Sequence, residues 1–182
     1  NTTGNRNTAF GHQSMHQNTE GSHNTALGYL TLKNTTASSN TAVGNLAMTE
    51  NISGVDNVAL GMSALRNSTA SNYNTAIGKR ALYDANRTAD SDGYNIAVGY
   101  AAGYTGTNNI TTGNKNTLLG ASTAAASAAA TNQTVIGYGA SGQADNSVTL
   151  GNADVTAVYM SQDKGATVYA AALGFGSTAM TL

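Results

Sequence analysis

Tyrosines mixed with acidic and basic side chains gather between residues 83 and 104 of this chain, in a combination suited to binding sugars. A tyrosine ring offers a flat apolar surface for stacking, and its hydroxyl forms hydrogen bonds. Asp accepts hydrogen bonds from sugar hydroxyls and Arg donates to them. The pattern therefore predicts a saccharide-binding set, against the alternative that long surface turns merely tolerate polar residues. Its members are Tyr83, Asp84, Arg87, Asp90, Asp92, Tyr94, Tyr100 and Tyr104.

Two groups of residues are candidates for binding a metal ion, and neither has a complete set of ligands. His12 and His16 are evenly spaced and share a face of an extended segment, but a metal site needs further ligands at fixed geometry, so solvated surface histidines are favoured. The run Asp90-Ser91-Asp92-Gly93 resembles the start of a calcium loop, yet no Glu follows at the required place, which favours an ordinary turn. We predict no metal site and no cofactor.

Catalytic constellations are also missing from the pattern. The carboxylates are scattered without a pair suited to glycoside hydrolysis. Serines are plentiful, but none lies in a nucleophile elbow with a histidine partner. We therefore predict that the chain is not an enzyme.

Composition narrows the possible partners. Only 9% of the 182 residues are charged and the net charge is −1, so there is no basic patch for a phosphate backbone and nucleic acid is not expected as a partner. No apolar run approaches the roughly 20 residues of a membrane helix, so membrane insertion is not expected. The absence of Cys excludes disulfides and leaves the compartment open. Because the chain opens directly in the repeat described next, without a signal peptide, we expect it to begin within a longer protein.

A five-residue word recurs along most of the chain, as in Asn24-Thr25-Ala26-Leu27-Gly28 and Asn74-Thr75-Ala76-Ile77-Gly78. Its glycines are residues 11, 28, 44, 61, 78, 99, 120, 137 and 151, so the steps are 17, 16, 17, 17, 21, 21, 17 and 14 residues. Equal units at a fixed period indicate a solenoid in which each unit stacks on the next. The two long steps contain the tyrosine-rich region, so loops are expected to protrude there.

Each unit reads as two short strands joined by turns, which predicts an all-β, parallel β-solenoid (β-roll) with coils about 4.8 Å apart. In Thr25-Ala26-Leu27 the outer two residues share one face and Ala26 has the other. We expect the large apolar residue and Thr25 to point inward and the alanines to form an outer face. The repeated Asn predicts an amide ladder along one corner, and the repeated Gly predicts a positive φ or a bend without room for a side chain.

A second alternation follows each glycine and predicts a second inward-facing strand, formed by Leu30 with Leu32, Leu46 with Met48, and later Leu65 and Leu82. The run from Ala121 to Ala130 favours a helix on propensity. The preserved 17-residue step across it favours another coil instead, and we adopt that interpretation.

Two segments divide the chain. Residues 1–151 form the repeat β-roll of about nine coils. Residues 152–182 are expected to leave the roll as a C-terminal β-hairpin, in which Val155 to Tyr159 pairs with Val168 to Leu173 across a turn. A 17-residue coil encloses few side chains, so its own core is thin. We expect a homotrimer in which the alanine faces of three copies pack around a common axis.

The word Asn146-Ser147-Val148-Thr149-Leu150-Gly151 resembles the head repeat of trimeric autotransporter adhesins, which form a left-handed parallel β-roll. The longer repeat form with the 17-residue step, illustrated by the stretch 51–65, is more similar to repeats of bacteriophage tail fibres that precede a self-cleaving chaperone domain. This resemblance covers nearly the whole chain. It implies a trimeric fibre on a virion tail or a cell surface, whose partners are copies of itself and a glycan or protein on a host cell.

Three functions follow as hypotheses. The first is the structural, receptor-contacting shaft of a phage tail fibre, and the second is the head of a bacterial adhesin. The third, an ice-binding solenoid, needs a flat array of Thr. The Thr column breaks at Val58 and Ile96 and is expected to face inward, so this function is the least favoured.

Overall fold

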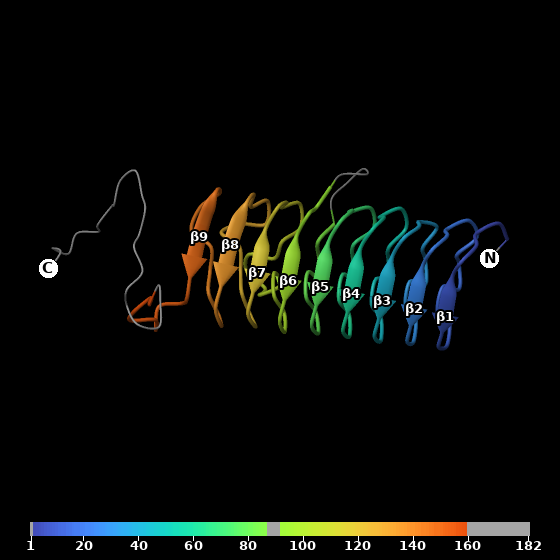
Figure 1. Cartoon of the computed structure of the whole chain (residues 1–182), viewed down its shortest axis with the longest axis horizontal. Coiled ribbons are helices and arrows are strands. Elements are labelled where there is room, and N and C mark those ends of the chain that lie inside the picture. The colour runs from blue at the N-terminus through green and yellow to red at the C-terminus, as the bar shows by residue number, and fades with distance from the viewer. Residues whose placement is uncertain (1, 87–91, 160–182) are drawn as a thin grey trace, which may run out of the picture.

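The computed structural model describes residues 2–86 and 92–159, and within them the chain is all-β without a helix. Its nine strands lie side by side in chain order in a single parallel sheet, forming an elongated stack (Figure 1). The strands are β1 (Thr8–Phe10), β2 (Thr25–Leu27), β3 (Thr41–Val43), β4 (Val58–Leu60), β5 (Thr75–Ile77), β6 (Ile96–Val98), β7 (Thr117–Leu119), β8 (Gln133–Ile136) and β9 (Ser147–Leu150). Because each strand pairs with the equivalent strand of the next repeat, the predicted parallel β-solenoid is confirmed.

The register of the sheet follows the sequence repeat residue for residue. Ala26 lies opposite Ala42, and Leu27 lies opposite Val43. The register is kept across both 21-residue steps, where Ala76 lies opposite Ala97 and Ala97 opposite Leu118. The additional residues of the second long step are therefore accommodated outside the sheet. Equivalent side chains stand in columns along the solenoid.

The strand face that points inward is the opposite of the one expected: the alanine faces the interior and the large apolar residue faces outward. The central alanines of β2 to β6 are fully buried, whereas Leu27 and Leu60, each of which directly follows such an alanine, are 44% and 45% exposed. The reason is the narrow cross-section of a coil, which accepts only one large side chain at a given level. That side chain comes from the opposite wall, where Leu32, Met48, Leu65 and Leu82 are fully buried. The alanines are the small partners that make room for them.

The last coils exchange the large and the small position. Leu118 and Val135 replace the strand alanine and are fully buried, while the opposite wall changes from Leu82 to Gly103 and then Ala124. A Cβ on Gly103 would lie 2.9 Å from Cδ2 of Leu82 and 3.1 Å from Cδ1 of Leu118. The enclosed volume is therefore conserved while the residue that fills it moves from one wall to the other.

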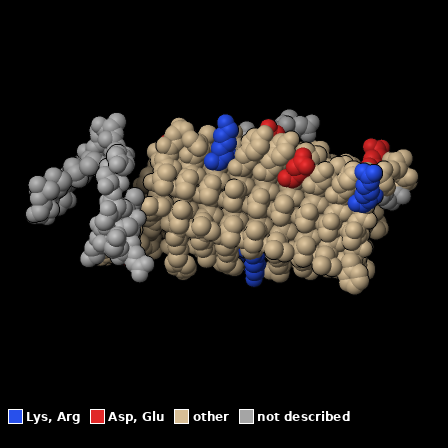
Figure 2. All heavy atoms as spheres, in the orientation of Figure 1, with Lys and Arg blue, Asp and Glu red and all other residues tan. Residues whose placement is uncertain are grey.

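The reversal leaves one continuous row of large apolar side chains outside. We call this row the aliphatic column, although it begins with a phenylalanine. It consists of the residue before the motif glycine of each repeat word: Phe10, Leu27, Val43, Leu60, Ile77, Val98, Leu119, Ile136 and Leu150. A second outward column holds mostly Thr, interrupted by Val58, Ile96 and Val148. None of the strand residues is charged. Figure 2 shows the face over the strands nearly free of Lys, Arg, Asp and Glu, with the charged side chains toward its edges.

The wall opposite the sheet is not the second strand that we expected. Leu30 and Leu32 have φ values of 56° and 50°, and Leu46 and Met48 have 60° and 50°. Left-handed residues at every second position are incompatible with a β-strand. The backbone still forms hydrogen bonds between coils: the Leu30 N–H donates to His12 and the Leu32 N–H donates to Ala47 in the next coil. Of the residues predicted to face inward, Leu30 and Leu46 are only half-buried.

The predicted amide ladder is confirmed, and it is buried. From Asn7 to Asn95 each ladder Asn accepts, at its side-chain oxygen, the backbone N–H of the Asn in the next coil, as Asn24 does from Asn40 and Asn40 does from Asn57. The side-chain amides of Asn57, Asn74, Asn95 and Asn116 also donate to the side-chain oxygen of the Asn in the preceding coil, at 3.1 to 3.2 Å. The ladder satisfies polar groups at a corner that water does not reach.

The repeated glycines have the positive φ that was predicted, between 128° and 139° in the column from Gly11 to Gly137. A Cβ on Gly61 would lie 2.6 Å from the carbonyl carbon of Gly78. Backbone of the next coil therefore occupies the space that a side chain would need, which explains why the position admits only glycine.

Residues 121–130 contain no helix, and Ala124 forms a bridge with Ser141 of the following coil, so another coil is the correct interpretation. Residues 152–159 contain no strand. The partner expected for them in a hairpin, Val168 to Leu173, lies outside the described residues.

Candidate functional site

The second of the two 21-residue steps forms a loop, residues 105–109, that stands out from the coil, and its residues Thr105, Gly106 and Thr107 are exposed. The chain leaves the coil after Gly103 and returns at Ile110, whose N–H donates to the Gly103 carbonyl at 2.9 Å. The protruding loop predicted for this step is therefore present. The additional residues of the first long step include 87–91, so the predicted site residues Arg87 and Asp90 lie outside the described residues.

Ile110 fills the space that Gly103 leaves. Gly103 occupies the position at which the five preceding coils carry Leu or Met. A Cβ on it would lie 3.7 Å from Cδ1 of Ile110, whose side chain is fully buried. The loop is consequently anchored in the core at its returning end.

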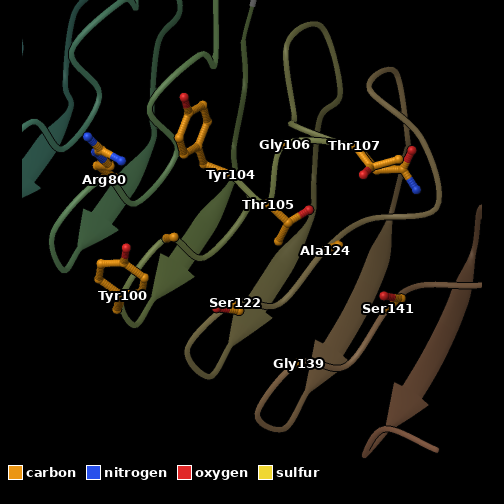
Figure 3. A pocket seen from close by; sticks show the side chains of 12 residues that line it. Arg80, Tyr100, Tyr104, Thr105, Gly106, Thr107, Ser122, Ala124, Gly139 and Ser141 are labelled. Atoms are coloured by element: carbon orange, nitrogen blue, oxygen red, sulfur yellow. The ribbon is translucent and has the colours of Figure 1, made fainter.

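Beside this loop the surface is hollowed into a groove of about 630 Å³ that extends across several coils. In Figure 3, Arg80 lies toward one end and Ser141 toward the other, with Tyr100, Tyr104 and the loop between them. The groove is lined by Arg80, Tyr100, Ala101, Tyr104, Thr105, Gly106, Thr107, Asn108, Ser122, Ala124, Gly139 and Ser141. Its volume lies within the range of small-ligand sites, roughly 300–1,000 Å³.

The groove exists because side chains become small along one column. The second residue after the motif glycine is small in all of the last three coils, whereas four of the five earlier coils carry a long side chain there. In chain order these residues are Gln13, Leu30, Leu46, Ser63, Arg80, Ala101, Ser122 and Gly139. Ala124 and Ser141 are the fourth residues after their motif glycines, and this column holds Leu or Met in earlier coils. Removing these side chains opens the floor, and the loop raises one side.

The aromatic side chains at the groove are held by neighbours in the preceding coil. The rings of Tyr83 and Tyr104 lie 4.7 Å apart at an angle of 37°. Arg66 donates to the Tyr83 hydroxyl at 2.8 Å and lies 5.8 Å from its ring centroid. Lys79 Nζ lies 6.0 Å from the ring centroid of Tyr100, which is half exposed. Of the predicted set, Tyr100 and Tyr104 line the groove and Tyr83 supports it.

Asp84 anchors the loop. Its two carboxylate oxygens accept hydrogen bonds from Asn67 at 2.9 Å and from Asn109 at 3.0 Å. Asn109 in turn accepts the Gly106 N–H at 2.7 Å, which closes the loop at its tip. Both oxygens of Asp84 are therefore engaged within the protein, and its role in this arrangement is to position the groove wall.

Asp92 and Tyr94 lie away from the groove. They precede β6, whereas Tyr100 follows it, so the two groups lie beyond opposite ends of one strand. Tyr94 stacks on Tyr73, with ring centroids 5.0 Å apart and an interplanar angle of 6°. Its hydroxyl donates to the Asp92 carboxylate at 2.9 Å, and this hydrogen bond is the main reason that the pKa of Tyr94 is raised. Desolvation and the charges of Asp92 and Tyr73 raise this pKa further.

Arg80 is the groove residue that sequence reasoning missed. It precedes the tyrosine-rich region, and its only signal in the sequence is its place in the column of Ala101 and Ser122, one repeat earlier. Its side chain is exposed at the end of the groove.

His12 and His23 make separate contacts with different residues. His12 stacks on Tyr29 at 5.5 Å, and His23 lies 3.0 Å from an Arg6 guanidinium nitrogen. Within residues 2–86 and 92–159 there is no group of three or more His, Asp or Glu placed to hold a metal ion. The same residues contain no helix long and apolar enough to span a membrane.

No family model, curated protein or solved structure matches this chain.

Proposed function

We propose that the chain is the shaft of a trimeric phage tail fibre, in which three solenoids pack through the aliphatic column and surface loops contact a host-cell glycan. The observation that carries this proposal is the column itself. Monomeric soluble proteins rarely expose a contiguous apolar row of this kind, and such a row marks an interface.

The chemistry of the column favours copies of the same chain as its partners. Its side chains recur once per coil. A second copy of the chain has the same axial period, so it places an equivalent side chain opposite each of them. The strands that carry it contain no charged residue, so like charges do not oppose one another when three copies meet. Three solenoids around one axis remove the column from water and enlarge a core that is thin in the single chain.

The trimer proposed here differs from the one expected from the repeat pattern. The central alanines of β2 to β6 are buried and are not available to a second copy. The aliphatic column takes their place as the contact surface, so the proposed oligomer is kept and its interface is replaced.

A bacterial adhesin head is the second candidate, favoured by the final 14-residue step and the word that ends at Gly151. Immunogold electron microscopy with an antibody against this chain separates the two. Gold on the tails of virions supports the fibre, and gold on the bacterial surface supports the adhesin. Labelling of neither would contradict both proposals.

Ice binding is the least supported function. The Thr column faces outward, contrary to the expected direction, since Thr25 and Thr41 are exposed. It is interrupted by Val58 and Ile96, and it runs beside side chains of unequal size. Thermal hysteresis in the purified protein would be required to favour this function.

A further inference from the structure

We infer that the groove between Arg80 and Ser141 binds an acidic saccharide, with Arg80 pairing the carboxylate of one sugar unit. This inference rests on the proposed contact with a cell-surface glycan and adds to it the place and the chemical class of the ligand.

The charge of the groove is the first argument. Among the described residues that line the groove, Arg80 is the only one that carries a charge at neutral pH. Lys79 adds a second cation beside Tyr100. The nearest acidic side chain tied to the groove wall, Asp84, already accepts hydrogen bonds from two amides. The groove therefore presents positive charge without a competing carboxylate along its lining.

The state of Arg80 is the second argument. Within the part of the chain that the structure describes, no ion pair or side-chain hydrogen bond involves it. The guanidinium of Arg66, in the preceding coil, is by contrast bound to the hydroxyl of Tyr83. A guanidinium offers a planar pair of donors that matches the two oxygens of a carboxylate. Arg80 is thus available for an anionic partner that enters the groove.

The remaining surfaces match the rest of a sugar. Tyr100 and Tyr104 provide aromatic faces next to Arg80, and the rings are held by Lys79 and Tyr83. Hydroxyls of Thr105, Ser122 and Ser141 follow along the groove. From the coil of Arg80 to the coil of Ser141 there are three steps, or about 14 Å. This length accommodates a short oligosaccharide lying along the solenoid axis.

A phosphate-bearing ligand is less favoured by this arrangement. Phosphate sites in proteins gather several backbone N–H groups or more than one arginine around the anion. Here one guanidinium is accompanied by aromatic rings and hydroxyls, which suits a single carboxylate on a largely neutral, ring-shaped molecule.

The test is an array of acidic oligosaccharides, each printed beside its carboxyl-reduced counterpart, probed with the intact assembled protein. At least one pair is expected to show about tenfold or greater preference for the acidic form, because the carboxyl-reduced form cannot make the charge-assisted hydrogen bonds to Arg80. Arg80→Gln is expected to abolish that preference and leave the weak binding of the reduced form. Lys115→Ala, which removes an exposed cation before β7, is the charge-matched control and is expected to retain it.

Two results would overturn the inference: no preference for the acidic member of any pair, or a preference that survives Arg80→Gln. Both leave the proposed fibre intact, because trimer mass is measured on the same samples and does not depend on Arg80. A trimer that binds neutral sugars as well as acidic ones would retain the fibre and remove the acidic ligand. A monomer that discriminates through Arg80 would retain the site and remove the fibre.

Discussion

The side-chain oxygen of Asn57 accepts two hydrogen bonds from Asn74 in the next coil, one from its backbone N–H at 2.9 Å and one from its side-chain amide at 3.1 Å. Both residues are fully buried. One side chain therefore fixes the distance and register between two coils at a corner without water.

Replacing Asn57 with Ala is expected to destabilise the protein by about 3 kcal/mol, because the buried backbone N–H of Asn74 loses its acceptor and a buried cavity forms. The side-chain amide of Asn74 keeps its hydrogen bonds to Ser71 and Asn72. Asn45→Ala, at an exposed position of the preceding coil, is the control and is expected to change stability by less than about 0.5 kcal/mol. Urea unfolding followed by circular dichroism measures both. Equal midpoints for the two variants would show that the ladder does not stabilise the stack.

The glycine column makes a second prediction. Gly61→Ala places a Cβ 2.6 Å from the carbonyl carbon of Gly78 at a φ of 134°, so a loss of more than about 3 kcal/mol is expected. Gly106 also has a positive φ, 91°, but nothing lies within 4 Å of its Cβ position. Gly106→Ala is therefore expected to cost only about 1 to 2 kcal/mol. Thermal unfolding of both variants separates crowding from backbone strain, and similar losses would refute the role of crowding.

Ile110 tests the link between the loop and the core. Ile110→Ala leaves a cavity above Gly103 and is expected to lower the free energy of unfolding by about 2 to 5 kcal/mol. Ile52→Ala, at a side chain that is 51% exposed, serves as the control with the same chemical change. If the two variants unfold alike, Ile110 does not fill the space in the way described.

Tyr94 gives a prediction about pH. Its raised pKa means that the protonated phenol is favoured in the folded protein, so the contribution of its hydrogen bond is present below about pH 10 and is lost as pH rises through the raised pKa. Asp92→Asn removes the charge and is expected to lower this pKa toward its usual value. NMR of ¹³C-labelled tyrosine, with Tyr94→Phe for assignment, follows the titration.

Asp56→Asn is the matched control for that titration, since Asp56 precedes β4 as Tyr94 precedes β6. It is expected to leave the pKa of Tyr94 unchanged. A Tyr94 titration that is the same in the wild type and Asp92→Asn would contradict the assigned cause.

Much of the fold could be predicted from the period alone. The repeat gave the parallel stack, the register across unequal steps, the asparagine ladder and the positive φ of the glycines. These features depend on which residues recur, and recurrence is visible in a single sequence.

The direction of the strand faces could not be obtained in the same way. Alternation in Thr25-Ala26-Leu27 separates two faces but does not say which one is enclosed, and residue size favoured the wrong choice. The informative signal is the exchange at Leu118, where a large residue replaces the usual alanine while Gly103 and Ala124 replace Leu or Met on the opposite wall. A second strand was wrongly predicted because apolar spacing does not reveal the left-handed φ of Leu30 and Leu32.

The candidate site could be predicted only in part. The long steps located the loop, and the tyrosines located its surroundings. Arg80 and the small residues of the groove floor were missed because they become neighbours only when four successive coils are stacked.

The central claim concerns the aliphatic column, and sedimentation equilibrium tests it most directly. Leu60 and Leu119 are 45% and 46% exposed in the single chain, so replacing both with Glu leaves the coil intact and places charge on the proposed contact surface. Ile52→Glu is the control, since Ile52 is exposed but lies outside the column.

The wild type and Ile52→Glu are expected to sediment with the mass of three chains, and Leu60→Glu/Leu119→Glu with the mass of one chain and an unchanged β-type circular dichroism spectrum. A wild-type protein with the mass of a single chain, or a trimer that persists in the double variant, would contradict the account.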